Sequence, residues 1–138
     1  MKSEWDKLPK EDKHKIEKGM LSLWGQSVFE TYGTSCEVCG MPACDPHHFF
    51  PRGSYPNMKY EVKNGVPLCQ VCHGRLHWRQ DPRINEAIIK RRGKEWYNWL
   101  NKRAKNTFPV TSKFLLDKKA ELETIIYGDR LFENEKET

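Results

Sequence analysis

Apolar side chains recur at intervals of three and four residues over much of this chain, a period that predicts amphipathic helices. The first such stretch covers residues 10–32, and its apolar face is formed by Ile16, Met20, Leu23, Trp24, Val28 and Phe29. Gly33 is a natural C-terminal stop for this helix, although Gly25 lies inside the run. We expect it to be a packing helix, preceded by a loose, charged arm at residues 1–12.

Two further helices are predicted immediately after the middle of the chain. Asp81 suits the N-cap position and Pro82 the first turn of a helix that stops before Gly93. A second helical piece covers residues 94–105 and carries the apolar residues Trp96, Trp99 and Leu100. Tryptophans at helical spacing are usually core residues, so these helices are expected to pack on the rest of the domain.

The last predicted helix follows a linker at residues 106–110. Thr111 or Ser112 can cap it, and its apolar face consists of Phe114, Leu115, Leu122, Ile125 and Ile126. Gly128 is expected to end the helix, and the acidic tail at residues 129–138 is expected to be partly disordered. This helix either packs on the N-terminal helix or pairs two copies of the chain; the pattern does not decide between the two.

The middle of the chain has a different period. Residues 47–50 are predicted to form a short strand, which the proline-rich loop at 51–56 breaks. Residues 58–62 alternate in character and predict a second strand, and Asn64-Gly65 is a turn signal. Helical character returns at residues 70–79. The order is therefore strand, loop, strand and helix, a ββα unit.

Four of the five cysteines form two CxxC pairs about thirty residues apart: Cys36, Cys39, Cys69 and Cys72. Four thiolates at this spacing predict a closed tetrahedral site for a structural zinc ion. A redox or partly occupied site is the alternative. Cys44 lies outside the pairs and is expected to be a free thiol. A metal staple suits a chain with 31% charged and only 37% hydrophobic residues.

Four of the five histidines lie close to these cysteines in the sequence: His47, His48, His73 and His77. His73 and His77 are four residues apart, so they share a helix face and can bind one ion. Adjacent strand residues point to opposite sides. One of His47 and His48 is therefore expected to reach that ion, while the other stays free to take a proton. A metal-bound phosphate and a free imidazole are what phosphodiester hydrolysis requires.

The charge distribution favours a polyanionic partner. The chain has 24 Lys and Arg against 19 Asp and Glu, a formal net charge of +5. Residues 82–107 hold eight basic and two acidic side chains, an excess of six, although solvated helix faces also carry basic runs. No apolar run reaches the 18 residues that a membrane span needs. We expect a cytoplasmic location, because the N-terminus is charged throughout and CxxC thiols suit a reducing compartment.

One set of residues resembles the HNH nuclease superfamily: His47, His48, Asn64, His73 and His77. The ββα-metal motif of that superfamily would cover residues 46–79, and a bracket of four zinc-binding cysteines is common in its zinc-stapled members. More narrowly, the runs at 48–53 and 88–93 are similar to NinG-type phage recombination nucleases, as are the Met-Lys-Tyr run at 58–60 and the placing of Asn64 before Cys69-x2-Cys72. The resemblance covers about half the chain and leaves the first and last helices outside it.

The resemblance implies a role for each of these residues. His48 would be the general base, and Asn64 would brace the loop that orients it. The catalytic divalent ion (Mg²⁺, Mn²⁺, Ni²⁺ or Zn²⁺) would be held by His47, His73 and His77, with Asp45 an alternative ligand if His47 points away. NinG-type proteins have Asn after the last cysteine, where this chain has His73, so the set is closer to the colicin-like branch. The metal and the subfamily therefore stay open.

The expected fold is α+β and mostly helical, with a small ββα-metal (HNH) core, a four-cysteine zinc site and flanking helices. We expect a single domain over 1–138, divided into an N-terminal arm and helix (1–33), the zinc-stapled core (34–80), basic and C-terminal helices (81–128) and an acidic tail (129–138).

The expected function is metal-dependent endonucleolytic hydrolysis of DNA, with branched or recombination DNA suggested by the NinG resemblance. For a phage-encoded chain the location would be the host cytoplasm. The side chains expected to contact DNA are Arg52, Lys59, Arg75, Lys90, Arg91, Arg92, Lys94, Lys102 and Arg103. One alternative is a non-catalytic zinc-binding module that binds DNA. Another is a zinc-stapled regulator that forms a homodimer through its last helix.

Overall fold

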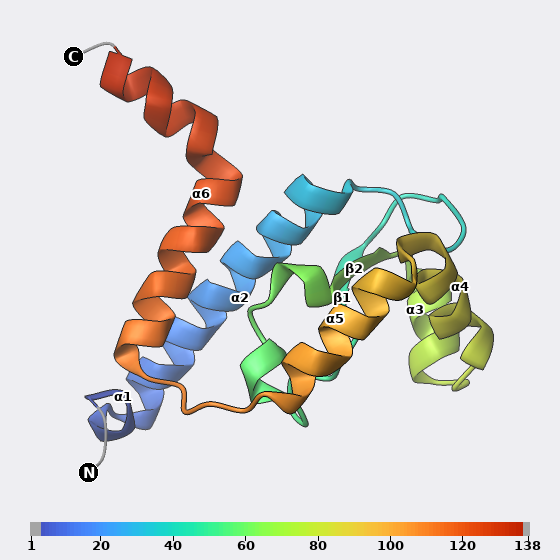
Figure 1. Cartoon of the computed structure of the whole chain (residues 1–138), viewed down its shortest axis with the longest axis horizontal. Helices are drawn as coiled ribbons and strands as arrows, with labels where there is room; N and C mark the ends of the chain where they lie inside the picture. Colours follow the sequence, from blue (N-terminus) through green and yellow to red (C-terminus); the bar gives the residue numbers. More distant parts are fainter. Residues whose placement is uncertain (1–3, 137–138) are drawn as a thin grey trace.

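The computed structural model describes residues 4–136, with side chains described as far as residue 128. Over this range the elements are α1 (Glu4–Lys7), α2 (Lys10–Tyr32), β1 (Asp45–His48), η1 (Pro56–Met58), η2 (Val62–Asn64), β2 (Gly65–Leu68), α3 (Gln70–His77), α4 (Pro82–Arg92), α5 (Lys94–Lys105) and α6 (Ser112–Lys136). Figure 1 shows α6 lying along one flank of α2, with the sheet and α3–α5 on the other. The fold is α+β and mostly helical, as predicted.

The predicted N-terminal helix is confirmed as α2. It ends at Gly33, whose φ of 90° is a conformation that L side chains rarely adopt. Its internal Gly25 allows close packing on β1, because a Cβ added there would lie 3.2 Å from Pro46 Cγ. The arm before α2 is not entirely loose: α1 places Trp5 in the core, 9% exposed. Residues 1–3 of the predicted arm lie outside the described residues.

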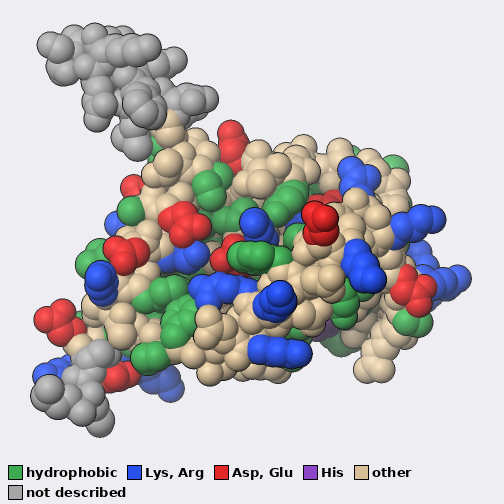
Figure 2. Space-filling view, viewed as in Figure 1, with side chains coloured by type: hydrophobic (Ala, Val, Ile, Leu, Met, Phe, Trp, Pro, Cys, Tyr) green, Lys and Arg blue, Asp and Glu red, His purple; other side chains and the backbone are tan. Residues whose placement is uncertain are grey.

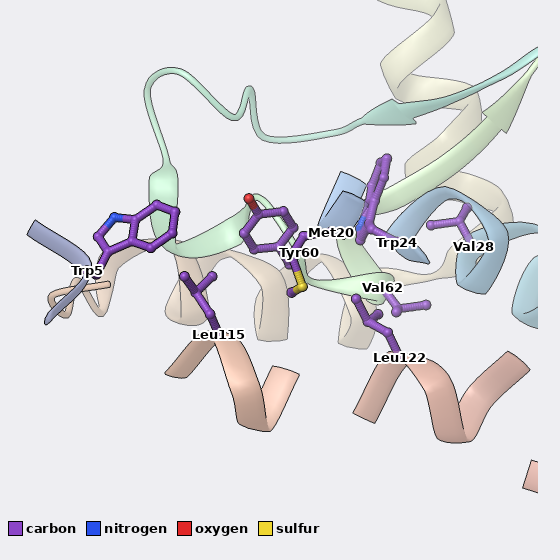
Figure 3. Packing of buried hydrophobic residues seen from close by; sticks show 8 residues of the cluster. All are labelled: Trp5, Met20, Trp24, Val28, Tyr60, Val62, Leu115 and Leu122. Carbon is purple, nitrogen blue, oxygen red and sulfur yellow. The ribbon is translucent and has the colours of Figure 1, made fainter. Parts of the chain in front are cut away.

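Helix α6 packs on α2 and closes the largest core cluster, shown in Figure 3: Trp5, Met20, Trp24, Val28, Tyr60, Val62, Leu115 and Leu122. The interface also has a polar contact, in which Ser27 Oγ lies 3.3 Å from the carbonyl oxygen of Leu122. Thr111 caps the helix, because its Oγ1 accepts a hydrogen bond from the Phe114 amide at 3.1 Å. Of the two alternatives for the last helix, packing on the N-terminal helix is therefore observed.

The prediction that this helix ends at Gly128 is wrong. Helix α6 continues to Lys136, so most of the predicted acidic tail is helical in the described range, and residues 137–138 lie outside it. Gly128 is not among the described glycines with positive φ, and a Cβ added there would make an ordinary contact, 3.8 Å from Thr124 Cγ2. A glycine ends a helix only where the backbone adopts the left-handed turn, and this one does not.

The two strands pair antiparallel, with His47 opposite Val66 and His48 opposite Gly65. Strand β1 begins two residues earlier than predicted and ends at His48. Gly65 is required at its position, because a Cβ would lie 2.1 Å from Val28 Cγ2 of α2. The absent side chain therefore lets the sheet pack closely on α2 beside the histidine pair.

The strand predicted at residues 58–62 is wrong. Its alternation is real, since Met58, Tyr60 and Val62 are all buried. The backbone nevertheless bonds locally: the Met58 amide donates to the Tyr55 carbonyl, and the Glu61 amide donates to the Met58 carbonyl. These are short 3₁₀-type turns. The second strand lies instead at residues 65–68, where the sequence pattern indicated only a turn at Asn64-Gly65.

The remaining helices agree with the predicted ones. Asp81 caps α4, Gly93 separates α4 from α5 with a φ of 99°, and α5 covers the predicted residues 94–105. A second core cluster joins α3 and α4 to the sheet through Cys36, Val66, Leu68, Cys69, Cys72, Ile84 and Ile88. Within residues 4–136, every helix is too short or too polar to cross a membrane.

Candidate metal centre and histidine pocket

The four predicted zinc ligands meet in one place. The Sγ atoms of Cys36, Cys39, Cys69 and Cys72 all lie within 4.8 Å of one another, and those of Cys39 and Cys69 are 3.5 Å apart. Zinc–sulfur bonds of about 2.3 Å in a tetrahedron separate sulfur atoms by roughly 3.8 Å. The cluster therefore has the size that a four-thiolate zinc ion needs, and these cysteines can hold a structural zinc.

Two turns present these thiols. In the first, the Cys36 amide donates to the Met41 carbonyl and the Gly40 amide to the Cys36 carbonyl, with Gly40 at a φ of 80°. In the second, Cys69 is the N-cap of α3, and its Sγ accepts from the Cys72 amide at 3.4 Å. Both turns direct amide hydrogens toward sulfur, which favours the thiolate form that binds metal.

The protein shifts the pKa values of the Cys36 and Cys72 thiols in opposite directions. Burial opposes ionisation of Cys36, but hydrogen bonds from the amides of Cys69, Cys39 and Val38 outweigh it and lower its pKa to about 7. Burial raises the pKa of Cys72, and the neighbouring thiols add to that rise. Such a group is costly to ionise without a cation at the centre. Cys44 is exposed and lies outside the cluster, as expected of a free thiol.

A buried ion pair fastens the first turn to α4. The guanidinium of Arg92 and the carboxylate of Glu37 are 5% and 4% exposed, and Arg92 Nε donates to Glu37 Oε2 at 2.9 Å. Arg92 also donates to the carbonyls of Lys63 and Gly65 and lies 3.7 Å above the centre of the Tyr32 ring. Arg92 therefore joins the cysteine turn, the start of β2 and the end of α2.

The histidines border a pocket of about 520 Å³ beside this centre. His47 of β1 and His73 and His77 of α3 lie in a row, with ring centroids 5.2 Å apart for the first pair and 5.7 Å for the second. His48 borders the same pocket, with Asp45 and Arg52. Among the described residues, however, only the four thiols converge tightly enough to form a metal cluster as they stand.

His48 is held on two sides. Its imidazole stacks on the indole of Trp24, with centroids 3.8 Å apart and planes 7° from parallel. Its Nε2 lies 2.8 Å from the carbonyl oxygen of Lys59. A carbonyl only accepts hydrogen bonds, so Nε2 carries the hydrogen and Nδ1 keeps its lone pair. The sequence indicated Trp24 only as a core residue, and nothing in the pattern pointed to this stacking.

The Asn64 side chain is fully buried and forms hydrogen bonds with both ends of the loop between the strands. Its Nδ2 donates to the carbonyls of Phe50 and Met58 at 3.0 and 3.3 Å, and its Oδ1 accepts from the Phe50 amide at 2.8 Å. Its own carbonyl accepts from the Phe49 amide. These bonds fix the chain directly after His48 and directly before Lys59, so Asn64 braces both segments that define the position of His48.

Burial affects both strand histidines. It lowers the pKa of His47 to about 4, with the neighbouring His73, His48 and His77 adding repulsion. It also lowers the pKa of His48 to about 4; the Lys59 carbonyl opposes this, while the charges of Arg52 and Lys59 add to it. Near neutrality both imidazoles are uncharged, the form in which imidazole accepts a proton or binds a metal.

The side chains predicted to contact DNA fall into several groups. Arg52 is exposed at the histidine pocket, and Lys59 pairs with Glu17 at 3.5 Å beside it. Arg103 lies over the Phe108 ring, 4.8 Å from its centre. Arg92 is occupied inside the protein and is not available to a partner. The exposed members on α4 and α5 are Lys90, Arg91, Lys94 and Lys102, and Figure 2 shows basic side chains over these helices.

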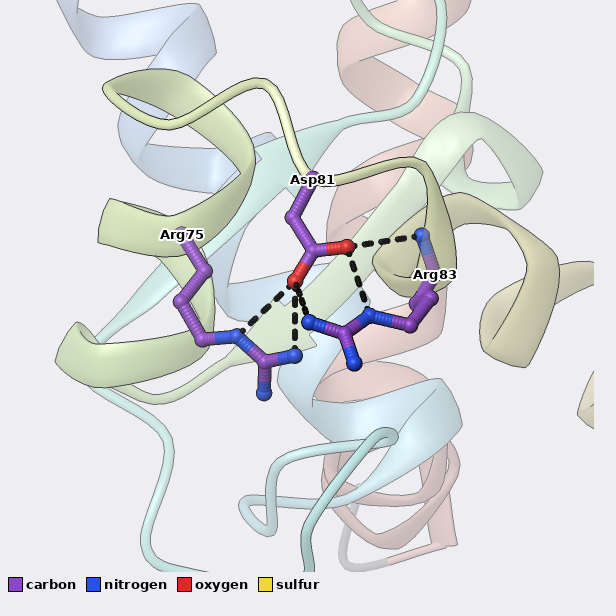
Figure 4. Close-up of polar contacts among 3 residues, drawn as sticks. All are labelled: Arg75, Asp81 and Arg83. Atoms are coloured by element: carbon purple, nitrogen blue, oxygen red, sulfur yellow. Dashed lines mark hydrogen bonds and ion pairs between the residues drawn. The ribbon is translucent and has the colours of Figure 1, made fainter.

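Arg75 is engaged by Asp81 (Figure 4). Its Nη2 lies 2.7 Å from Asp81 Oδ2, and the same carboxylate accepts from the amide and the side chain of Arg83. The side-chain bonds from Arg83 and Arg75 hold the pKa of Asp81 well below its usual range. Asp81 is thus both the predicted N-cap of α4 and the link between α3 and α4.

Comparisons of this chain with protein-family models, curated proteins and solved structures found no match. The function of the chain is therefore inferred from the geometry of its described residues.

Proposed function

We propose that this protein is a metal-dependent endonuclease of the HNH type that hydrolyses DNA phosphodiester bonds. The observation that carries the proposal is the placement of His48. A half-buried, uncharged imidazole borders an open pocket, is fixed by Trp24 and Lys59, and lies beside three further histidines. Positioning and a free lone pair are what a general base for water needs.

In this proposal His48 takes the proton of the attacking water. Its Nε2 hydrogen is held by the Lys59 carbonyl, so the water proton goes to Nδ1. The positive charge that develops on the imidazole is then stabilised by that same carbonyl dipole. Trp24 contributes by fixing the ring plane, because a stacked indole opposes rotation of the imidazole.

Asn64 acts through His48 rather than on the substrate. It is fully buried and its side chain bonds only to backbone groups of the loop between β1 and β2. Since Phe50 and Met58 lie on either side of this loop, the amide fixes His48 relative to the Lys59 carbonyl. This is the bracing role that the resemblance implied.

The catalytic ion would be held by His47, His73 and His77. Three imidazoles form a donor set typical of a site with open positions, in contrast to the closed set of four thiols. When bound, the ion would supply Lewis-acid stabilisation of the charge on the phosphate and the leaving oxygen. Among the described residues the ligand atoms of these histidines do not converge as they stand, so side-chain rotation would accompany binding.

A hollow with an excess of basic side chains adjoins the pocket. Arg52 and Gly53 border both the histidine pocket and this hollow of about 550 Å³, which is also lined by Lys18, Lys59 and Glu17, the ion-pair partner of Lys59. The basic side chains at this junction suit the phosphates that flank a scissile bond. Exposed Lys90, Arg91, Lys94 and Lys102 would contact phosphates farther away, and the affinity should then fall steeply with salt.

Cleavage assays test the proposal. The zinc-loaded protein is incubated with duplex, single-stranded, flap and four-way DNA, with and without added Mg²⁺, Mn²⁺ or Ni²⁺. Cleavage that depends on the added ion is the expected result. If DNA stays intact in every combination, while the protein is folded and carries one zinc per chain, the proposal is wrong.

The alternative is a non-catalytic zinc module that binds DNA. It is favoured by one observation: among the described residues the thiols form a compact cluster, whereas the histidines do not converge as closely. Metal counting separates the two. The nuclease should take up a second divalent ion that His73→Ala abolishes, and the non-catalytic module should hold one zinc only.

A further inference from the structure

A further hollow lies beside α3, and Trp78 is part of its lining. The hollow has a volume of about 310 Å³ and is lined by Gln70, Val71, Gly74, Arg75, Trp78 and Arg79. The Trp78 side chain is 83% exposed and that of Val71 is 71% exposed. Large apolar side chains that face solvent together indicate a binding surface more often than a structural need.

Gly74, which has no side chain, forms part of the lining of the hollow. Gly74 lies on α3 between Val71 and Trp78, and a Cβ added there would meet only Trp78 Cδ1, at 3.9 Å. The Trp78 amide donates to the Gly74 carbonyl at 2.8 Å, which fixes the backbone where the indole departs from the helix. The open indole face therefore borders a shallow floor that a flat ligand can cover.

The basic lining of the hollow favours a ligand that carries negative charge. Its lining contains two arginines and no acidic residue. Asp81 engages Arg75, whereas Arg79 is exposed and lines the hollow together with Trp78. An aromatic face beside an arginine suits a nucleobase that carries a phosphate, because the base stacks and the guanidinium pairs with the phosphate.

The Trp78 hollow lies close to the proposed site of the reaction, because Trp78 contacts one of the histidines. The His77 and Trp78 rings are in contact, with centroids 5.3 Å apart and planes 89° apart. A base in a duplex is stacked on both faces and exposes only its edges, so it cannot cover an indole. We propose that Trp78, with Val71, Gly74 and Arg79, forms a subsite for one unpaired nucleobase next to the cleaved phosphate.

The subsite rests on the proposed nuclease function for its purpose, but its test does not depend on cleavage. Binding is measured in the His48→Ala background by anisotropy, with a labelled single strand and a duplex of equal length as probes. Because Trp78 is exposed, its replacement should leave the fold intact, which thermal unfolding checks. Trp99 of α5, which is 39% exposed, provides the matched control.

Replacing Trp78 with Ala should weaken single-strand binding about tenfold, whereas Phe should retain most of the affinity. Duplex binding should change less than about twofold, and Trp99→Ala should behave like the parent on both probes. The subsite is refuted if Trp78→Ala binds the single strand as the parent does, or weakens both probes equally. Loss of single-strand binding on Trp78→Ala, together with no cleavage of any substrate by the parent that keeps His48, would support the subsite while refuting the nuclease. Metal-dependent cleavage by the parent, together with single-strand binding that Trp78→Ala leaves unchanged, would support the nuclease while refuting the subsite.

Discussion

Arg92 and Glu37 form a buried ion pair that links the basic helix α4 to the first cysteine turn. The sequence pattern placed Arg92 among the DNA-contacting residues, because it lies in a run of basic side chains. Its neighbour Arg91 has the same charge and is exposed. The two arginines therefore offer a matched test of which basic residues hold the fold and which face a partner.

Replacing Arg92 with Ala should lower the free energy of unfolding by about 3–5 kcal/mol, because it leaves the Glu37 carboxylate buried without its partner. Replacing Arg91 with Ala should change stability by less than about 0.5 kcal/mol. Chemical denaturation measures both. An Arg92→Ala protein as stable as the Arg91→Ala protein would contradict the assignment of Arg92 to the fold.

Loss of the zinc ion should unfold the part of the protein that packs around the four cysteines. Structural zinc contributes apparent binding energies of about 10–16 kcal/mol, comparable to or larger than the whole stability of a typical domain. Cys72→Ala should therefore reduce bound zinc from one equivalent to none and abolish a cooperative thermal transition. Elemental analysis and calorimetry measure these outcomes. Cys44→Ala is the control, and full zinc content with unchanged melting in Cys72→Ala would argue against the site.

The helices could be predicted from the sequence because local signals define their ends. Gly33 and Gly93 adopt positive φ, and Asp81 and Thr111 accept the capping bonds expected of them. Gly128 failed as a stop because nothing in the local sequence distinguishes a helical glycine from a left-handed one.

The sheet and the surroundings of His48 were less predictable, since they depend on tertiary contacts. Residues 58–62 alternate as a strand does, yet the backbone turns where Asn64 captures the loop carbonyls. Asn64-Gly65 resembled a hairpin turn, whereas Gly65 opens β2 because α2 leaves no room for a side chain. The stacking of Trp24 on His48 joins residues 24 positions apart, which no local pattern encodes.

Asn64→Ala should destabilise the protein by about 3 kcal/mol, because buried carbonyls and an amide lose their partner. Asn64→Asp keeps the size and the acceptor, but near neutrality it places a buried carboxylate against the Phe50 and Met58 carbonyls, so its cost should be at least as large. Asn98→Ala, at an exposed position of α5, is the control. Denaturation curves measure stability, and equal stability of the Asn64 and Asn98 variants would contradict the bracing role.

The link between α3 and α4 should weaken in acid. Because the pKa of Asp81 is lowered in the folded state, the carboxylate stabilises the protein above its ordinary pKa of 3.8. That contribution should be lost as the pH falls below this value. Wild type should thus melt at a higher temperature than Asp81→Asn near neutrality, and the difference should shrink below pH 3.8. A difference that is constant with pH would contradict this linkage; Asp117→Asn serves as the control.

The central claim is that His48 is the general base of a nuclease, and replacing it with Ala tests this most directly. His48→Ala should lower the rate constant of DNA cleavage by at least about a hundredfold, because a positioned base contributes 10²–10⁴-fold. Zinc content, thermal unfolding and DNA affinity should stay close to those of wild type, and Gln26→Ala, at an exposed position of α2, should cleave normally. Cleavage by His48→Ala at the wild-type rate would contradict the claim.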